Sequence, residues 1–253
     1  MRIAIAGGTG VVGSYAADAA EDAGHDVVVL ARAGGVNVQT GDGLAAALDG
    51  VDVVVDALNL ATYKRASAER FFVTTSRHLQ DAGNRAGVRH IVSLSIVGID
   101  RVPTYGYYVA KLAQEAAVTQ GPVPVTILRA TQFHEFPAQI MRATRRGPIA
   151  IVPRIKSQPV AARTVGAHLV TLASEQPGGT HELAGPEVHD IADLAKRIVK
   201  HRNLKLKVLP VPVPGKRGAR IRAGALLATE ATTIDGPAFG EWLAGDDVSR
   251  LEL

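Results

Sequence analysis

Short apolar runs alternate along the first half of the chain with longer stretches whose apolar residues recur at helical spacing. Strands are expected at residues 3–6, 27–31, 36–39, 52–57, 90–95 and 125–129, and helices at 11–23, 65–86 and 107–119. The run at 52–57 lacks alternation, as is typical of a strand buried on both faces. Strands that alternate with helices predict a parallel sheet covered on both sides. The expected fold class is therefore α/β, with a Rossmann-type doubly wound parallel sheet.

The pattern changes after residue 129. Helices are expected at residues 136–146, 164–174, 187–200 and at the end of the chain within 236–243, and strands at 149–152 and 208–213. We interpret this half as a small C-terminal substrate lobe. The predicted domains are a Rossmann core at residues 1–133 and a lobe at 134–253, with a diffuse boundary that leaves one continuous domain open.

Composition restricts the kinds of chemistry that the chain can perform. The 253 residues include no cysteine, which excludes disulfides, thiolate metal sites and a cysteine nucleophile. The histidines lack ligand spacing, so no metal site is expected. Net charge is +4, but the basic residues are scattered, so we expect a small-molecule substrate and no nucleic acid.

No apolar stretch approaches the roughly 20 residues that span a bilayer. The apolar run at residues 3–6 is too short for a signal peptide. We therefore expect a cytoplasmic protein that does not associate with membranes. The two long helices at 65–86 and 107–119 could form a dimer bundle, so the chain is expected to be a monomer or a homodimer.

A glycine-rich segment directly follows the first strand and opens the first helix. It comprises Gly7, Gly8, Thr9, Gly10, Val11, Val12 and Gly13. Its glycines fit G-x-G-x-x-G, and in this context the motif predicts a dinucleotide-binding loop. Glycine permits the tight turn, lets backbone N–H groups approach a pyrophosphate, and allows the helix to pack closely on the sheet. The helix N-terminus supplies unpaired donors for the phosphates.

The residue at the end of the second strand discriminates between the two nicotinamide cofactors. An acidic residue there favours NAD, whereas an arginine accommodates the 2′-phosphate of NADP. Arg32 stands at this position, and its planar fork suits a phosphate. NADP(H) is therefore favoured over NAD(H). Asp42 follows the expected third strand, where it could either reach the adenine edge or cap the helix that starts near Gly43.

A candidate catalytic pair lies on the helix at 107–119. Tyr107 and Lys111 are four residues apart and so share one helix face. A neighbouring cation would lower the pKa of the tyrosine, which could then protonate a carbonyl oxygen as hydride arrives. Lys111 could also hold the nicotinamide ribose. Ser95 ends the preceding strand and could orient the same oxygen, while Tyr108 is expected to pack or to contact substrate.

These motifs, together with the segment from Arg129 to Phe133, resemble the atypical short-chain dehydrogenase/reductase superfamily, and most closely its NmrA-like NAD(P)H-binding branch. The resemblance covers roughly the first 165 residues well. It implies the Ser, Tyr and Lys roles given above and places Asn59 and Thr131 beside the cofactor. Gln132 and Phe133 would lie near the nicotinamide or the substrate mouth. His134, which follows them, is a weaker candidate for a substrate contact or proton donor.

The sequence therefore predicts an NADPH-dependent oxidoreductase that transfers hydride to a carbonyl, a quinone or a similar small organic substrate. Fold similarity alone does not decide between functions within such a family. One alternative is a non-catalytic NADP(H)-binding redox sensor or regulatory protein. A second alternative is an extended-type epimerase or dehydratase, which the arginine at position 32 and the small C-terminal lobe disfavour.

Overall fold

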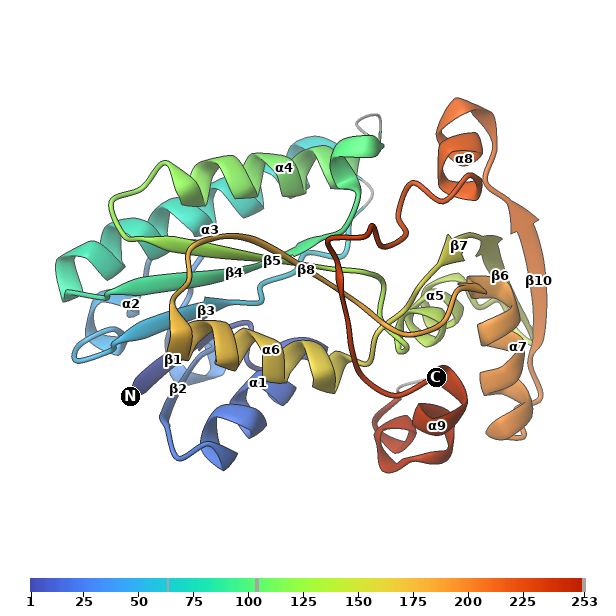
Figure 1. Cartoon of the computed structure of the whole chain (residues 1–253), viewed down its shortest axis with the longest axis horizontal. Helices are drawn as coiled ribbons and strands as arrows, with labels where there is room; N and C mark the ends of the chain where they lie inside the picture. The colour runs from blue at the N-terminus through green and yellow to red at the C-terminus, as the bar shows by residue number, and fades with distance from the viewer. Residues whose placement is uncertain (63, 103–104, 252–253) are drawn as a thin grey trace. The chain divides into compact units, whose positions relative to one another are not determined.

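A seven-stranded sheet with the order β11-β8-β5-β4-β3-β1-β2 forms the centre of the fold (Figure 1). Its strands are β1 (Arg2–Ala6), β2 (Asp26–Leu30), β3 (Val53–Asp56), β4 (His90–Ile96), β5 (Val125–Ala130), β8 (Gly179–Ala184) and β11 (Thr233–Ile234). This computed structural model describes residues 1–62, 64–102 and 105–251, without the side chains of residues 216 and 217. Strand β1 pairs in parallel with β2 on one side and β3 on the other, which confirms the predicted doubly wound α/β class.

Helices cover both faces of this sheet (Figure 1). On one face α3 (Arg65–Ala86) packs against α4 (Gly106–Thr119), and on the other α1 (Val11–Asp22) packs against α6 (Ala162–Glu175). A side-chain carbon on Gly166 would come within 2.7 Å of the Ala16 backbone nitrogen, so glycine is what allows α6 to lie this close to α1. Strand β3 is buried along its whole length, as its apolar run predicts.

The chain divides into two compact units, each built from separate segments. The first comprises Met1–Ile96, Pro103–Arg129 and Ala162–His181, and the second Val97–Val102, Ala130–Ala161 and Glu182–Leu253. Helix α6 and the start of β8 therefore belong to the first unit. The chain crosses between the units several times rather than once near residue 133.

The second unit has its own small sheets and core. Its elements are α5 (Phe136–Thr144), β6 (Ile149–Arg154), β7 (Lys156–Ser157), β9 (His189–Asp190), α7 (Ile191–His201), β10 (Lys207–Pro212), α8 (Gly215–Arg222) and α9 (Phe239–Ala244). Strands β6 and β10 pair in parallel, and α5 and α7 pack against them. Fully buried Met141, Ile198 and Phe239 belong to the core that these elements share.

The third strand expected at residues 36–39 is absent, and this prediction was wrong. Val36 and Val38 are both buried, which produces the alternation typical of a strand. The segment instead forms a turn, in which the Val38 carbonyl lies 2.8 Å from Nδ1 of His78 on α3. The short helix α2 (Leu44–Ala47) follows, with Gly43 at its N-terminus in the left-handed region.

Other differences concern element boundaries in the second half of the chain. The helix expected at 187–200 begins only at Ile191, because His189 and Asp190 form β9 and the Asp190 carboxylate accepts a hydrogen bond from Ala192 N–H at the start of α7. Helix α8 and strand β8 were not predicted. Among the described residues, no helix combines the length and the apolar character needed to cross a membrane.

Candidate functional site

The glycine loop forms a backbone cradle that side chains would fill. Gly7 has a φ of +82°, and its carbonyl accepts a hydrogen bond from Gly10 N–H at 2.8 Å. A side-chain carbon on Gly13 would lie 2.1 Å from the Gly7 carbonyl oxygen, so no larger residue fits there without moving the loop. Thr9, Gly10 and Val11 are exposed, and no side chain caps α1. The cradle therefore suits the pyrophosphate of a dinucleotide.

The loop lies where the strand order of the sheet reverses, between β1 and β3. A side-chain carbon on Gly7 would meet the Ala57 carbonyl oxygen at 2.7 Å, so the loops after β1 and β3 are in contact. Asn59 is exposed two residues further along, and its Oδ1 accepts a hydrogen bond from the Tyr107 hydroxyl at 2.6 Å. In open α/β sheets this reversal point is where ligands bind. Asn59 and Tyr107 therefore come together beside the predicted cofactor loop.

The two candidates for the adenosine end occupy different settings. Arg32 is exposed in the short turn directly after β2. Asp42 accepts a hydrogen bond from the Thr40 hydroxyl at 2.6 Å. No side chain caps α2, so the capping role considered for Asp42 is not observed.

The phenol of Tyr107 lies in an apolar environment. Its ring packs edge-on against the Phe72 ring, with centroids 5.7 Å apart. Burial, with a smaller contribution from Tyr105, raises the pKa of Tyr107 above its usual value of 10.0. The expectation that Lys111 lowers the pKa of Tyr107 was therefore wrong, because the Lys111 ammonium group donates to Leu94 and Gln114 instead. Tyr107 is a neutral phenol at pH 7.

Lys111 is buried beneath α4, where its ammonium group is surrounded by acceptors. It donates to the Leu94 carbonyl at 2.7 Å and to the side-chain oxygen of Gln114. Burial lowers the pKa of Lys111 to about 8, while Asp56 and Glu115 act in the opposite direction. The side chain thus belongs to a polar network within the first unit. We call Asp56, Lys111, Gln114, Glu115, Arg129 and Ser95 the α4 network.

Ser95 is held at the other end of the α4 network. Its hydroxyl donates to Oε1 of Glu115 at 2.5 Å. Arg129 forms a two-pronged ion pair with the same carboxylate, at 2.9 and 2.6 Å. Because the Ser95 hydroxyl donates its proton to Glu115, it can accept a further hydrogen bond but cannot donate a second one.

The remaining sequence candidates lie mainly in the second unit. The Thr131 hydroxyl donates to the Gln158 carbonyl at 2.6 Å, and Gln132 accepts from Ser157 at 2.7 Å. Phe133 pairs with Val160 in an isolated β-bridge. His134 is 1% exposed. In the first unit, Tyr108 is buried and its ring packs edge-on against Tyr105, with centroids 4.6 Å apart.

His134 lies among aromatic rings rather than at an open surface. The centroids of Phe239 and Trp242 are 5.2 and 5.3 Å from its own, and its Nε2 lies 3.1 Å from the Pro237 carbonyl oxygen. Burial lowers the pKa of His134 to about 4. The imidazole is therefore neutral at pH 7, which argues against a proton-donating role.

Three members of the α4 network were not predicted from the sequence. Asp56 was included in an apolar strand, although it is fully buried and accepts a hydrogen bond from Gln114 at 2.8 Å. Burial raises the pKa of Asp56 despite the nearby Lys111. Glu115 and Gln114 are four and three residues from Lys111 on the same helix, and this spacing is the signal that could have identified them.

Two solved structures illustrate the similarity of the fold. The chain matches a short-chain dehydrogenase/reductase superfamily protein from Agrobacterium tumefaciens with bound NAD at 20% identity and a TM-score of 0.68, covering 99% of this chain and 97% of that one. It matches the NADPH-dependent quinone oxidoreductase QOR2 of Escherichia coli, complexed with NADPH, at 17% identity and a TM-score of 0.69, covering 96% and 98%. Relatives of this fold thus include proteins that bind either nicotinamide cofactor.

Comparison of the sequence with known proteins identifies similar curated proteins and a matching family. The DNA mismatch repair protein MutS of Methanosarcina barkeri is 28% identical over 144 residues, which are 57% of this chain but only 15% of MutS. The chain therefore spans a small part of the curated relatives that it matches. The model of the NAD(P)H-binding family matches residues 7–176, a range that begins at the glycine loop and ends after α6. The chain belongs to this NAD(P)H-binding family, and its fold is that of the short-chain dehydrogenase/reductase proteins.

Proposed function

We propose that this protein is an NADPH-dependent oxidoreductase that reduces a carbonyl, a quinone or a similar small organic substrate. The observation that carries the proposal is the position of Tyr107. Its hydroxyl binds Asn59 on the loop that follows β3, and this loop contacts the phosphate cradle at Gly7. This position, at the point of the sheet where ligands bind in open α/β folds, supports a role for Tyr107 as the proton donor.

A bound nicotinamide dinucleotide supplies the hydride for such a reaction. Tyr107 provides the proton, which passes from its hydroxyl to the substrate oxygen. The phenol is protonated at neutral pH, and because burial raises its pKa, the transfer requires that the substrate oxygen develop negative charge as hydride arrives. Asn59 accepts from the same hydroxyl and orients it. Ser95 would have to turn its proton from Glu115 to the substrate oxygen in order to orient it, and Lys111 donates to Leu94 and Gln114, so neither side chain is assigned a step.

Removing the Tyr107 hydroxyl tests this assignment. Tyr107→Phe should lower kcat by about 10²–10⁴-fold, the usual contribution of general acid catalysis, and leave the affinity for NADPH nearly unchanged. The matched control is Tyr15→Phe, which removes a hydroxyl from α1 and should retain turnover. Rates with a panel of ketones, aldehydes and quinones, and calorimetric titration with NADPH, give the two readouts. Full activity of Tyr107→Phe would remove Tyr107 from the mechanism.

The preference for NADPH rests on Arg32, which is exposed directly after β2. A charge-assisted hydrogen bond to the 2′-phosphate contributes about 1.5–3 kcal/mol, which is roughly 10–100-fold in affinity. Arg32→Gln should weaken NADPH binding by this factor and leave NADH binding unaltered. Arg70→Gln, which changes an exposed arginine of α3, is the control. Equal losses for both cofactors would contradict the assignment.

The α4 network also favours a second candidate, a non-catalytic NADP(H)-binding sensor. Both Ser95 and Lys111 are engaged by neighbours within the unit, so two of the three expected catalytic groups have structural partners. A sensor would bind NADPH and NADP⁺, would lose NADPH affinity in Arg32→Gln, and would reduce no member of the substrate panel. Turnover that depends on Tyr107 would eliminate this candidate.

A further inference from the structure

A cavity of about 430 Å³ lies within the second unit, and the reaction proposed above does not use it. Its lining residues are Arg154, Lys156, Val188, His189, Asp190 and Arg222. They come from the end of β6, from β7, from β9 and the residue before it, and from the end of α8. The volume lies within the range of about 300–1,000 Å³ that is typical of small-molecule sites.

The lining carries an excess of positive charge. Arg154, Lys156 and Arg222 are cationic, and of the six lining residues only Asp190 is acidic. Asp190 is partly committed to the fold, because its Oδ1 accepts from Ala192 N–H at 2.9 Å. Its Oδ2 lies 3.6 Å from Arg154, beyond the usual length of a charge-assisted hydrogen bond. Among the six lining residues the cations therefore exceed the carboxylates by two, while Glu187, which pairs with His189, and Asp193, which interacts with Arg154, supply negative charge beside the lining.

The backbone fixes the positions of several of these groups. Strands β7 and β9 pair in antiparallel register, with Lys156 opposite Asp190. Arg222 donates from one guanidinium nitrogen to the Val213 carbonyl at 2.5 Å. This bond holds the side chain, and the other N–H groups of the guanidinium can still bind a ligand. His189 pairs with Glu187 at 2.9 Å. Of the three cationic groups, Arg222 is thus held before any ligand arrives, which lowers the entropic cost of ordering it.

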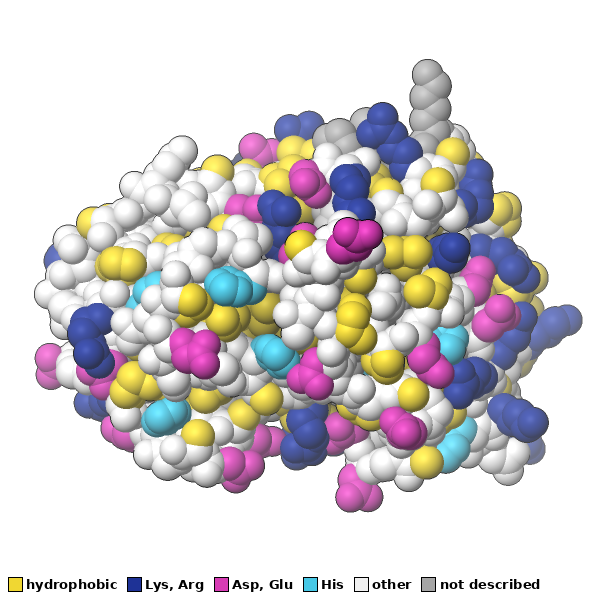
Figure 2. Space-filling view, viewed as in Figure 1, with side chains coloured by type: hydrophobic (Ala, Val, Ile, Leu, Met, Phe, Trp, Pro, Cys, Tyr) yellow, Lys and Arg dark blue, Asp and Glu magenta, His cyan; other side chains and the backbone are white. Residues whose placement is uncertain are grey.

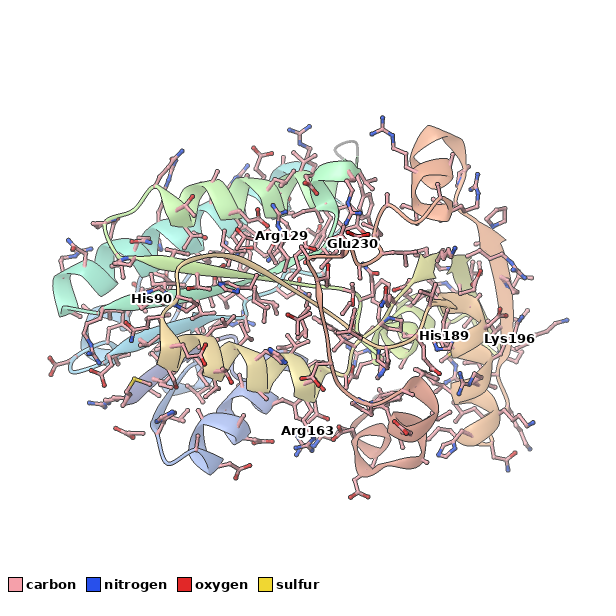
Figure 3. The ribbon with its side chains drawn as sticks, in the orientation of Figure 1. His90, Arg129, Arg163, His189, Lys196 and Glu230 are labelled. Carbon is pink, nitrogen blue, oxygen red and sulfur yellow. The ribbon has the colours of Figure 1, made fainter. Side chains whose placement is uncertain are left out.

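Positive side chains also gather on the surface of this unit. In Figure 2, Lys and Arg side chains cluster over the region that Figure 1 labels α7, α8 and β10. Figure 3 labels His189 at the start of α7 and Lys196 on the helix itself. Electrostatic attraction of this kind raises the local concentration of anions.

We propose that this cavity binds the phosphate group of a small organic phosphomonoester. A phosphomonoester carries a charge of about −1.5 to −2 at pH 7 and offers three acceptor oxygens to the three cations of the lining, whereas a carboxylate carries less charge and offers two. Arginine forks suit phosphate geometry. Val188, 46% exposed, offers an apolar surface for the organic part. The proposal concerns the second unit and does not depend on the oxidoreductase assignment.

Titration with phenyl phosphate tests the proposal. The full-length protein is first saturated with NADP⁺, so that the glycine loop and Arg32 cannot take up the probe, and binding is followed by calorimetry and by ³¹P NMR. We expect saturable binding with one site. Benzoate, which has the same ring with a single carboxylate, should bind more weakly. Benzoate binding as tight as phenyl phosphate binding would overturn the assignment to phosphate.

Charge-removing variants locate the site. The double variant Arg154→Gln/Arg222→Gln should weaken phenyl phosphate binding by at least about tenfold, as expected when charge-assisted hydrogen bonds are lost. Arg70→Gln, which removes an exposed cation of α3 in the first unit, should leave binding unchanged. An equal loss in both variants would indicate nonspecific attraction and contradict the proposal, as would binding that survives the double variant.

Two further measurements separate this proposal from the proposed function. The NADPH affinity and the thermal midpoint of the double variant should equal those of the parent, which shows that it folds. If NADP⁺ fails to bind the parent, the phenyl phosphate titration of the cofactor-free protein still tests the cavity. Absence of saturable phenyl phosphate binding in either form would refute the cavity proposal and leave the reductase proposal standing.

Discussion

Lys111 and His134 are two buried, titratable side chains in different units, and burial acts on both in the same direction. It lowers the pKa of Lys111 from 10.5 to about 8 and that of His134 from 6.5 to about 4. Because the two pKa values fall by about the same amount, the ordinary pKa of each group decides its charge at pH 7: Lys111 remains a cation and His134 is neutral. The surroundings differ in the hydrogen-bond partners that they offer to each group.

The hydrogen bonds agree with this difference. Nε2 of His134 faces the Pro237 carbonyl and must carry the proton, while its buried Nδ1 has no partner among the described residues. A second proton on Nδ1 would have no acceptor there. The ammonium group of Lys111, in contrast, finds acceptors in Leu94 and Gln114. The α4 network therefore offers acceptors to a buried positive charge, whereas Nδ1 of His134 has none among the described residues.

The largest expected effect concerns the ion pair of Glu115 and Arg129, whose side chains are 12% and 18% exposed. Glu115→Ala leaves the Arg129 charge nearly buried without its partner and should lower the free energy of unfolding by about 3–5 kcal/mol. The matched control is Glu69→Ala, which breaks an exposed pair with Arg65 and should cost less than about 1 kcal/mol. Urea unfolding measures both. Equal losses would mean that burial of the network does not matter.

The next effect is a pH dependence of stability that originates at His134. Its pKa is lower in the folded protein, about 4, than its ordinary value of 6.5. The unfolded chain therefore takes up the proton first, and stability that is complete above pH 6.5 is lost as the pH falls towards 4. The loss should approach about 3 kcal/mol. Urea unfolding at several pH values between 4 and 7.5 measures this slope.

Replacement of the histidine isolates its contribution. His134→Phe keeps a ring among Phe239 and Trp242 and should remove this part of the pH dependence. His201→Gln, at the exposed end of α7, should keep the slope of the parent. A parent and a His134→Phe variant with identical slopes between pH 6.5 and 4 would show that His134 titrates normally in the folded protein.

The smallest effect tests whether carboxylates maintain the charge of Lys111. Asp56→Asn removes the larger of the two carboxylate contributions and should lower the pKa of Lys111 below about 8. Titration of isotope-labelled lysine by NMR follows this group directly. Asp52→Asn, a change at an exposed ion pair with Arg89, is the control. An unchanged Lys111 pKa in Asp56→Asn would mean that Asp56 is protonated and contributes no charge.

The sequence predicted the features that depend on local pattern. The glycine loop was recognised because its residues are contiguous, and α3 was predicted with the bounds that the structure shows, Arg65–Ala86. The strand expected at residues 36–39 failed because two alternating buried valines are too few to separate a strand from a turn. The contact between the Val38 carbonyl and His78 on α3 distinguishes the turn from a strand, and this contact cannot be seen in the local pattern.

The side-chain partners of the site could not be predicted in the same way. The sequence placed Tyr107 and Lys111 on one helix face, yet their contacts depend on strands that are far away along the chain. Ser95 and Arg129 meet at Glu115 because β4, β5 and α4 pack together. The charge of His134 likewise depends on α9, about a hundred residues further along.

The close crossing of α1 and α6 at Gly166 has a practical consequence for anyone who wishes to dissect this protein. A fragment that ends near residue 133 would contain the complete glycine loop but would lack the helix that covers α1. It would expose the apolar side of α1, including Tyr15 and Ala16, and aggregation during expression is the expected result. A minimal cofactor-binding fragment therefore needs the segment Ala162–His181 rejoined to the core by an engineered linker.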